Sequence, residues 1–160
     1  MQDAGAYPAI GSVLPMFGRI MASGNYALDR VDASGESVVT NTTPVGAYRG
    51  AGRPEATLAL ERIIDVYAAE IGMDPAELRR RNFLGKDDFP YVTQTGADMD
   101  TGDYEAALDK VLEIVDVDAL RAEQAARIDD PARPLLGIGW AAYVETVSYT
   151  HLTLPTTVFV

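Results

Sequence analysis

The chain of 160 residues contains no cysteine. It can therefore form no disulfide, no thiolate metal site and no iron–sulfur cluster. Basic residues are also scarce, because 13 lysines and arginines stand against 24 aspartates and glutamates and leave a net charge of −11. Nucleic-acid binding needs lysine and arginine to neutralise phosphates, so this charge argues against a nucleic-acid partner.

Long apolar runs are missing as well. No stretch of about 18 uncharged apolar residues occurs, so we expect no membrane span. No basic segment precedes an apolar core near Met1, so no signal peptide is visible, and we expect a cytoplasmic protein. A hydrophobic content of 48% and a charged content of 23% are ordinary for a globular chain.

Helices are predicted over much of the second half of the chain. One is expected over Pro54–Gly72, because its large apolar side chains form a single stripe at helical spacing. A second is expected over Pro75–Asn82, after the capping residue Asp74. Two more are expected after Asp103, the first capped by Asp103 itself and the second by Asp118. The apolar stripe of the first helix consists of Leu60, Ile63, Ile64, Tyr67 and Ile71.

Strands are predicted in the remaining segments. The runs Tyr26–Val31 and Ser37–Asn41 are separated by a turn signal and predict an antiparallel pair. Leu14–Met21 is expected to be a short helix, and Leu135–Thr146 a mostly buried strand that contains the single tryptophan, Trp140. The predicted fold class is therefore α+β.

The segment Asn41–Ala56 combines glycine with positive charge just ahead of the longest predicted helix. Gly50 and Gly52 permit a left-handed backbone and a close approach by a ligand. Arg49 and Arg53 add forked donors, and the first turn of a helix favours an anion. The residues alone leave two interpretations open: an anion site at Arg49, or a tight loop whose arginines only bond carbonyl groups.

The string TNTTPVGAYRGAGRPEA (residues 40–56), followed by DPAELRRRN (74–82), closely resembles the large subunit of molybdenum hydroxylases. That family includes xanthine dehydrogenase, aldehyde oxidase and carbon-monoxide-dehydrogenase-type enzymes. The loop is most similar to form II of the last group. The motifs GAYP, FPYVTQTG and DTGDY also follow in the family's order, so the resemblance covers roughly residues 3–145.

This resemblance implies an internal fragment whose residues 1–146 are part of a molybdopterin-binding domain. The cofactor is expected to be molybdenum on a molybdopterin, in its cytosine dinucleotide form. The enzyme is expected to be an oxidoreductase that hydroxylates an aldehyde or N-heterocycle carbon with oxygen from water. By resemblance, the cofactor contacts Ala47, Tyr48, Arg49 and Gly50, and the substrate faces Gly50, Ala51 and Gly52. No side chain here is expected to bind the metal.

Departures from the family's patterns narrow the substrate. The branch that oxidises carbon monoxide has a copper-binding cysteine at the position of Gly50, so copper ligation is not expected here. Xanthine-dehydrogenase-type members have an aromatic residue at the position of Ala51, which argues against a purine. The general-base glutamate is expected outside the fragment, so the fragment alone should be inactive.

The resemblance also implies partners. Electrons are expected to pass to a 2Fe-2S small subunit and an FAD-binding medium subunit, and the full-length protein is expected in a dimer of heterotrimers. The alternative for the whole chain is a standalone acidic α+β module that binds a small molecule or an anion without catalysis. A phosphate-binding transferase domain is disfavoured, because no Walker-type lysine follows the glycines.

Three further segments carry specific expectations. The run Arg79–Arg81 is interpreted as a solvated or carbonyl-capping last helical turn. Glu145 is a possible site carboxylate, although an exposed acid at a strand end is the favoured interpretation. Val147–Val160 is uncharged, and its string SYTHLTLPTT resembles translated sequencing-adapter DNA, so we expect a non-native tail.

Overall fold

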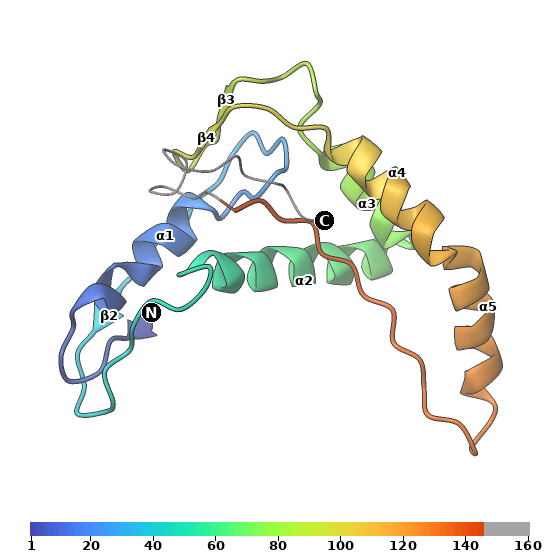
Figure 1. Cartoon of the computed structure of the whole chain (residues 1–160), viewed down its shortest axis with the longest axis horizontal. Coiled ribbons are helices and arrows are strands. Elements are labelled where there is room, and N and C mark those ends of the chain that lie inside the picture. Colours follow the sequence, from blue (N-terminus) through green and yellow to red (C-terminus); the bar gives the residue numbers. More distant parts are fainter. Residues whose placement is uncertain (146–160) are drawn as a thin grey trace.

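The computed structural model describes residues 1–145 and is organised around one long helix, α2. In Figure 1, α1 lies at the N-terminal end of α2, and α3 follows its C-terminal end. None of the helices in the described residues is long and apolar enough to cross a membrane. The predicted tail, residues 147–160, lies outside the described part of the chain. The α-helices of residues 1–145 are α1 (Leu14–Ile20), α2 (Arg53–Ile71), α3 (Pro75–Asn82), α4 (Tyr104–Val115) and α5 (Val117–Ile128).

The strands of the described residues are short. β1 (Gln2–Asp3) pairs in parallel with β2 (Ser37–Val38), and β3 (Tyr91–Val92) pairs antiparallel with β4 (Asp98–Met99). A 3-10 helix, Ile10–Val13, leads into α1. The combination of helices and strands confirms the predicted α+β class.

Aspartate side chains determine where three helices begin. Asp74 accepts a backbone N–H of the first turn of α3 at 2.8 Å, and Asp103 accepts one of α4 at 3.0 Å, as predicted. The prediction for α5 is wrong by two residues, because Asp116 caps it and not Asp118. Asp116 has a φ of 45°, and this left-handed residue separates α4 from α5.

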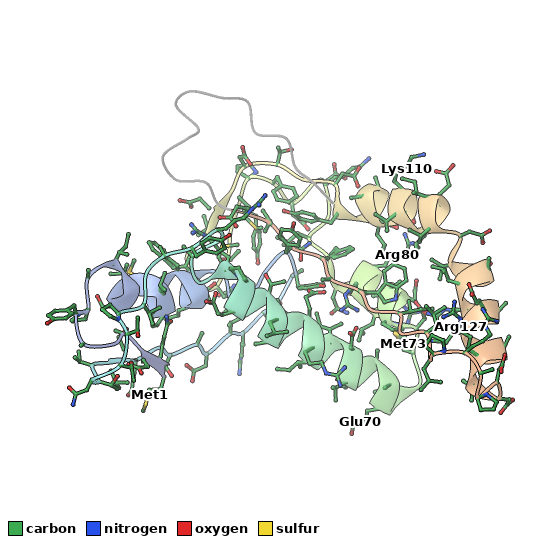
Figure 2. The ribbon with its side chains drawn as sticks, turned by 60° about the horizontal axis from the view of Figure 1, so that its bottom comes forward. Met1, Glu70, Met73, Arg80, Lys110 and Arg127 are labelled. Atoms are coloured by element: carbon green, nitrogen blue, oxygen red, sulfur yellow. The ribbon has the colours of Figure 1, made fainter. Side chains whose placement is uncertain are left out.

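The predicted helix over Pro54–Gly72 is confirmed, but part of its apolar stripe is not covered. Ile63, Tyr67 and Ile71 are 66%, 52% and 44% exposed. α2 packs on α1 and α3 with another face, on which Glu61 is 4% exposed. Figure 2 shows α2 with its side chains, ending beside the turn that leads to α3. The position of a side chain on α2 therefore depends on what packs around the helix and not only on its hydropathy.

The predicted antiparallel pair of Tyr26–Val31 with Ser37–Asn41 is wrong. Tyr26 instead forms an isolated antiparallel bridge with Phe83, and the two rings stack at a centroid distance of 5.4 Å. β2 pairs with β1 instead, and the Asp3 carboxylate accepts further hydrogen bonds from the threonine hydroxyls that follow β2. Both of these contacts join segments that are distant in sequence.

The predicted buried strand Leu135–Thr146 is also wrong over its described part. The segment forms no strand there, and most of its residues are exposed. It begins beside α5 and reaches α2 only with its last residues (Figure 1). Its main chain bonds side chains instead. Arg79 donates to the carbonyl oxygen of Trp140 at 3.0 Å, and the N–H of Ala142 donates to the Glu61 carboxylate at 2.9 Å. Side chains of α2 and α3 thus take the place of a neighbouring strand.

Candidate functional site

Three consecutive residues with left-handed backbones end the loop that enters α2. Their φ angles are 94° for Gly50, 44° for Ala51 and 88° for Gly52, and we call these residues the left-handed turn. A Cβ atom at residue 52 would lie 2.4 Å from the carbonyl oxygen of Leu14, so glycine is required for the turn to pack on α1. Ala51 has a Cβ atom and is therefore held in a conformation that costs energy.

A pocket of about 250 Å³ opens beside the left-handed turn. The loop contributes Tyr48, Arg49, Ala51 and Gly52 to its lining, and the first turn of α2 contributes Glu55. The Tyr48 side chain is 86% exposed, so its ring is available for stacking on a planar ligand. The pocket therefore combines an aromatic face with groups that can form hydrogen bonds.

Arg49 supplies the positive charge of this pocket. Its side chain is exposed, and no hydrogen bond or ion pair engages it within residues 1–145. Arg49 therefore does not bond a carbonyl group of the described chain, in contrast to the loop interpretation. Glu55 adds a negative charge, so the pocket suits a ligand that carries both acceptors for a guanidinium and donors for a carboxylate.

The structure distributes the predicted contact residues over two sides of the loop. Ala47 and Gly50 do not line the pocket. A Cβ atom at residue 50 would lie 2.6 Å from Cγ of Pro54 and 3.9 Å from Oε2 of Glu145. The side of the turn at Gly50 therefore faces Glu145. The predicted residues that do line the pocket are Tyr48, Arg49, Ala51 and Gly52.

Arg53 joins the left-handed turn to Glu145. Its Nη1 donates to the carbonyl oxygen of Gly50 at 3.3 Å, and its Nε lies 3.4 Å from Oε1 of Glu145. The guanidinium also lies over the Phe17 ring, 5.1 Å from the centroid. Burial raises the pKa of Glu145, and the charge of Arg53 opposes that rise. Glu145 is exposed, as the favoured interpretation expected, but no strand ends at it within residues 1–145, and it is paired with the loop through Arg53.

A buried cluster of charged and polar side chains supports α2 below the loop. The Glu61 carboxylate accepts a hydrogen bond from the Tyr26 hydroxyl at 2.7 Å and another from Nε of Arg79 at 2.8 Å. Arg79 is only 1% exposed and also pairs with Asp65 at 2.9 Å, so its interpretation as a solvated residue is wrong. Burial, together with the Glu61 carboxylate, raises the pKa of Tyr26, so its hydroxyl stays protonated and donates.

This buried cluster could not be recognised from the sequence. Glu61 occupies one position of a long helical pattern, and Arg79 is one of three consecutive arginines. No local signal distinguishes these two residues from their exposed neighbours. Their burial follows from the packing of α3 on α2, which only the three-dimensional arrangement shows.

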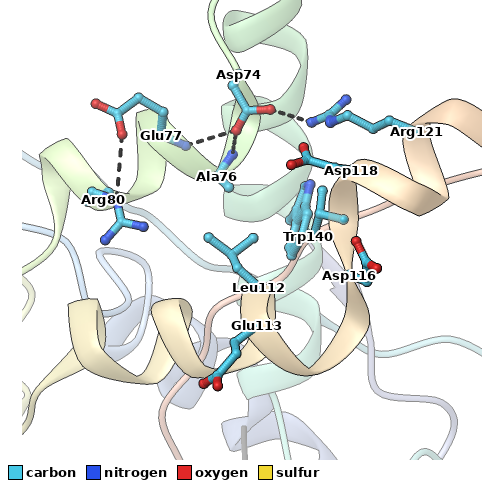
Figure 3. A pocket seen from close by; sticks show the side chains of 11 residues that line it. Asp74, Ala76, Glu77, Arg80, Leu112, Glu113, Asp116, Asp118, Arg121 and Trp140 are labelled. Atoms are coloured by element: carbon cyan, nitrogen blue, oxygen red, sulfur yellow. Dashed lines mark hydrogen bonds and ion pairs between the residues drawn. The ribbon is translucent and has the colours of Figure 1, made fainter.

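A larger pocket of about 540 Å³ lies between α3 and the corner of α4 and α5. Figure 3 shows Trp140 in it, together with Arg80 and Arg121. Both arginines are paired with acids, Arg80 with Glu77 and Arg121 with Asp74. Because these cations already have anionic partners, the smaller pocket at Arg49 is the better candidate for an acidic ligand.

Comparison with known proteins identifies relatives of this chain. Residues 1–83 match the family described as the molybdopterin cofactor-binding domain. The chain is 48% identical over 130 residues to the carbon monoxide dehydrogenase large chain of Hydrogenophaga pseudoflava, covering 79% of this chain and 16% of that one. It is 34% identical over 128 residues to the nicotine 6-hydroxylase large subunit of Paenarthrobacter nicotinovorans, covering 79% and 15%.

A solved structure agrees with this relationship. Quinoline 2-oxidoreductase from Pseudomonas putida 86 matches with a TM-score of 0.73 and 32% sequence identity, over 79% of this chain and 16% of that chain. The chain therefore spans about one sixth of the length of the relatives it matches.

Proposed function

The chain belongs to the molybdopterin cofactor-binding domain family of molybdenum hydroxylase large subunits, and we propose that its Tyr48–Gly52 segment contacts the cofactor. The observation that carries this proposal is Arg49, an exposed guanidinium without a partner in residues 1–145, at the edge of a pocket. The alternative of a standalone acidic binding module is not favoured, since the relatives are molybdenum enzymes.

The residues of the pocket fit a molybdopterin chemically. The pterin ring system carries both hydrogen-bond donors and acceptors, and the phosphate group of molybdopterin is anionic. Tyr48 offers an exposed ring, Arg49 a planar fork of donors, and Glu55 an acceptor. Gly52 lets the main chain pass close to α1, which keeps the pocket beside the first turn of α2. We further propose the cytosine dinucleotide form of this cofactor.

We propose an aldehyde or an N-heterocycle as the substrate, hydroxylated at a carbon atom with oxygen from water. When bound, the molybdenum cofactor supplies the oxidation. Ala51 leaves the pocket side of the turn without a large side chain, which leaves space for a ring. The names of two relatives specify quinoline and nicotine, which are both N-heterocycles.

Oxidation of carbon monoxide with copper is not part of this proposal, although one relative is a carbon monoxide dehydrogenase. A cysteine at position 50 would need a side chain where a Cβ atom already lies 2.6 Å from Cγ of Pro54. The left-handed φ of 94° also favours glycine there. The turn of this chain therefore has no room for the copper ligand without rearrangement.

The rest of the enzyme is proposed to lie in other residues and other chains. Because this chain spans about one sixth of its relatives, we propose that the general-base glutamate lies outside it and that the chain alone is inactive. This chain has no cysteine and so cannot bind a 2Fe-2S cluster itself; we propose that the clusters lie in a small subunit and FAD in a medium subunit. We propose a dimer of these heterotrimers in the cytoplasm.

Substitution of Arg49 in the full large subunit tests the cofactor proposal. Arg49→Ala removes charge-assisted hydrogen bonds worth about 1.5–3 kcal/mol, so molybdenum per subunit should fall when free cofactor is limiting, with affinity about ten- to a hundredfold lower. Arg49→Lys keeps the charge but loses the planar fork, so its loss should be smaller. Molybdenum is measured by mass spectrometry of the purified protein, alongside thermal unfolding.

Arg62→Ala is the matched control, because Arg62 is an exposed arginine of α2 that does not line the pocket. It should leave the molybdenum content unchanged. Full molybdenum content in Arg49→Ala, together with a large loss of stability, would mean that Arg49 is a structural residue.

A further inference from the structure

We propose that Glu61 and Arg79 are positioning residues for the left-handed turn and act through the segment 140–145. Neither residue is among those that line the pocket. Both residues form hydrogen bonds with the main chain of this segment and so fix it against α2. Glu145, at the end of the segment, pairs with Arg53, and Arg53 donates a hydrogen bond to the turn. The position of the turn does not depend on the proposed function, but the identity of the ligand in the pocket does.

The first link is the directional bonding of the buried pair. Oε1 of Glu61 accepts from the Tyr26 hydroxyl, and Oε2 accepts from both Arg79 and the main-chain N–H of Ala142. A buried ion pair contributes little net stability, because the cost of desolvation offsets the attraction. Apolar side chains could therefore fill this space equally well. What the charges add is a set of directed hydrogen bonds, two of which join the cluster to main-chain groups of the segment.

The second link is a two-point attachment of the segment. Arg79 donates to the carbonyl oxygen of Trp140 at 3.0 Å, and Glu61 accepts from the N–H of Ala142 at 2.9 Å. These main-chain groups are two residues apart, so they lie on the same side of an extended chain. The segment accepts one of these hydrogen bonds and donates the other. Together they define the register of the segment along α2 and its orientation.

The third link connects the segment to the turn. Three residues after Ala142, the carboxylate of Glu145 lies 3.4 Å from Nε of Arg53, whose side chain is 14% exposed. Arg53 donates through Nη1 to the carbonyl oxygen of Gly50 at 3.3 Å. Arg49 precedes Gly50 directly, so a shift of the Gly50 carbonyl moves the residue that carries the charge of the pocket.

Limited proteolysis of the full large subunit, purified without cofactor, tests this path. Trypsin can cut after Arg49, and the rate reports how often the loop opens, whereas cuts after Arg121 in α5 report the rest of the fold. Ala142→Pro removes the N–H that Glu61 accepts and changes no charge. Glu145→Gln removes the carboxylate charge that pairs with Arg53 and leaves the backbone unchanged. Fragments are quantified by mass spectrometry over time.

Both variants should accelerate cleavage after Arg49 by about fivefold, the factor expected when one hydrogen bond (Ala142→Pro) or one partly exposed ion pair (Glu145→Gln) is lost from a local opening equilibrium. Cleavage after Arg121 should not change. Glu113→Gln is the control, because Glu113 is an exposed carboxylate of α4 that pairs with Lys110, and it should change neither rate.

Three outcomes would overturn the proposal. The first is an unchanged rate after Arg49 in either variant, because the path needs both links. The second is an equal increase after Arg49 and Arg121, which indicates a general loss of the fold. The third is the same acceleration in Glu113→Gln. Because no cofactor is present, a failure here leaves the molybdenum content of Arg49→Ala to decide the proposed function separately.

Discussion

Arg79 and Arg49 are the same amino acid in opposite surroundings. Arg79 is 1% exposed and bonded to Glu61, Asp65 and the carbonyl of Trp140. Arg49 is exposed and has no partner among residues 1–145. A buried guanidinium must have its donors satisfied, whereas an exposed one can exchange water for a ligand. The donors of Arg79 are therefore used within the fold, whereas the guanidinium of Arg49 is accessible to a ligand, as the proposed function requires.

Arg79→Ala should have the largest effect on stability, because it leaves the Glu61 carboxylate buried without its main partner. We expect the free energy of unfolding to fall by about 3–5 kcal/mol, the usual cost of breaking a buried ion pair. Urea denaturation followed by circular dichroism measures it. Arg81→Ala is the control, because the Arg81 side chain is 61% exposed and, within residues 1–145, pairs only with Glu77 along α3, which is worth about 0.3–0.5 kcal/mol. Equal losses in both variants would remove the distinction between buried and exposed arginines.

Gly52→Ala should have an intermediate effect, although it lies at the binding loop. A left-handed conformation costs a residue with a Cβ atom about 1–2 kcal/mol, and the contact with the Leu14 carbonyl adds to this cost. The same urea denaturation measures the change. Gly46→Ala is the matched control, because a Cβ atom there would meet nothing within 4 Å. A Gly52→Ala variant as stable as the control would show that the turn does not depend on its packing against α1.

Arg49→Ala should have the smallest effect on stability, within about 0.5 kcal/mol, because Arg49 is a surface residue that has no partner in the described residues 1–145. The free energies of unfolding of Arg49→Ala and Arg79→Ala can be compared directly, because the chemical change is the same at both positions. Thermal and urea denaturation of the two variants measure the difference. A loss at Arg49 as large as that at Arg79 would show that the loop supports the fold and would weaken its assignment as a binding surface.

Much of the helical structure and of the candidate loop was predictable. The bounds of α3 agree with the pattern Pro75–Asn82, and Asp74 and Asp103 cap the helices that follow them. The glycines of the left-handed turn were recognisable, because few other residues adopt a positive φ. These features depend on residues within one or two helical turns of each other, so a short stretch of sequence contains the necessary information.

The strand pairs and the ion pairs were not predictable in the same way. The expected partner of Tyr26–Val31 was its neighbour in sequence, whereas Tyr26 bridges Phe83 and β2 pairs with β1. Glu145 was recognised only as a possible site acid, since nothing near it in the sequence indicates Arg53 as its partner. Such contacts join distant segments, and any of several pairings is compatible with the local pattern.

The sequence by itself determined the helices, their caps, the glycine-dependent turn at Arg49 and the family resemblance, because each is written in consecutive residues. Only the tertiary structure decided that Glu61 and Arg79 are buried while Ile63 is exposed. It also decided that the segment ending at Glu145 lies against α2. The physical reason is that burial depends on which elements pack on a helix face, and that choice is made between parts of the chain far apart in sequence.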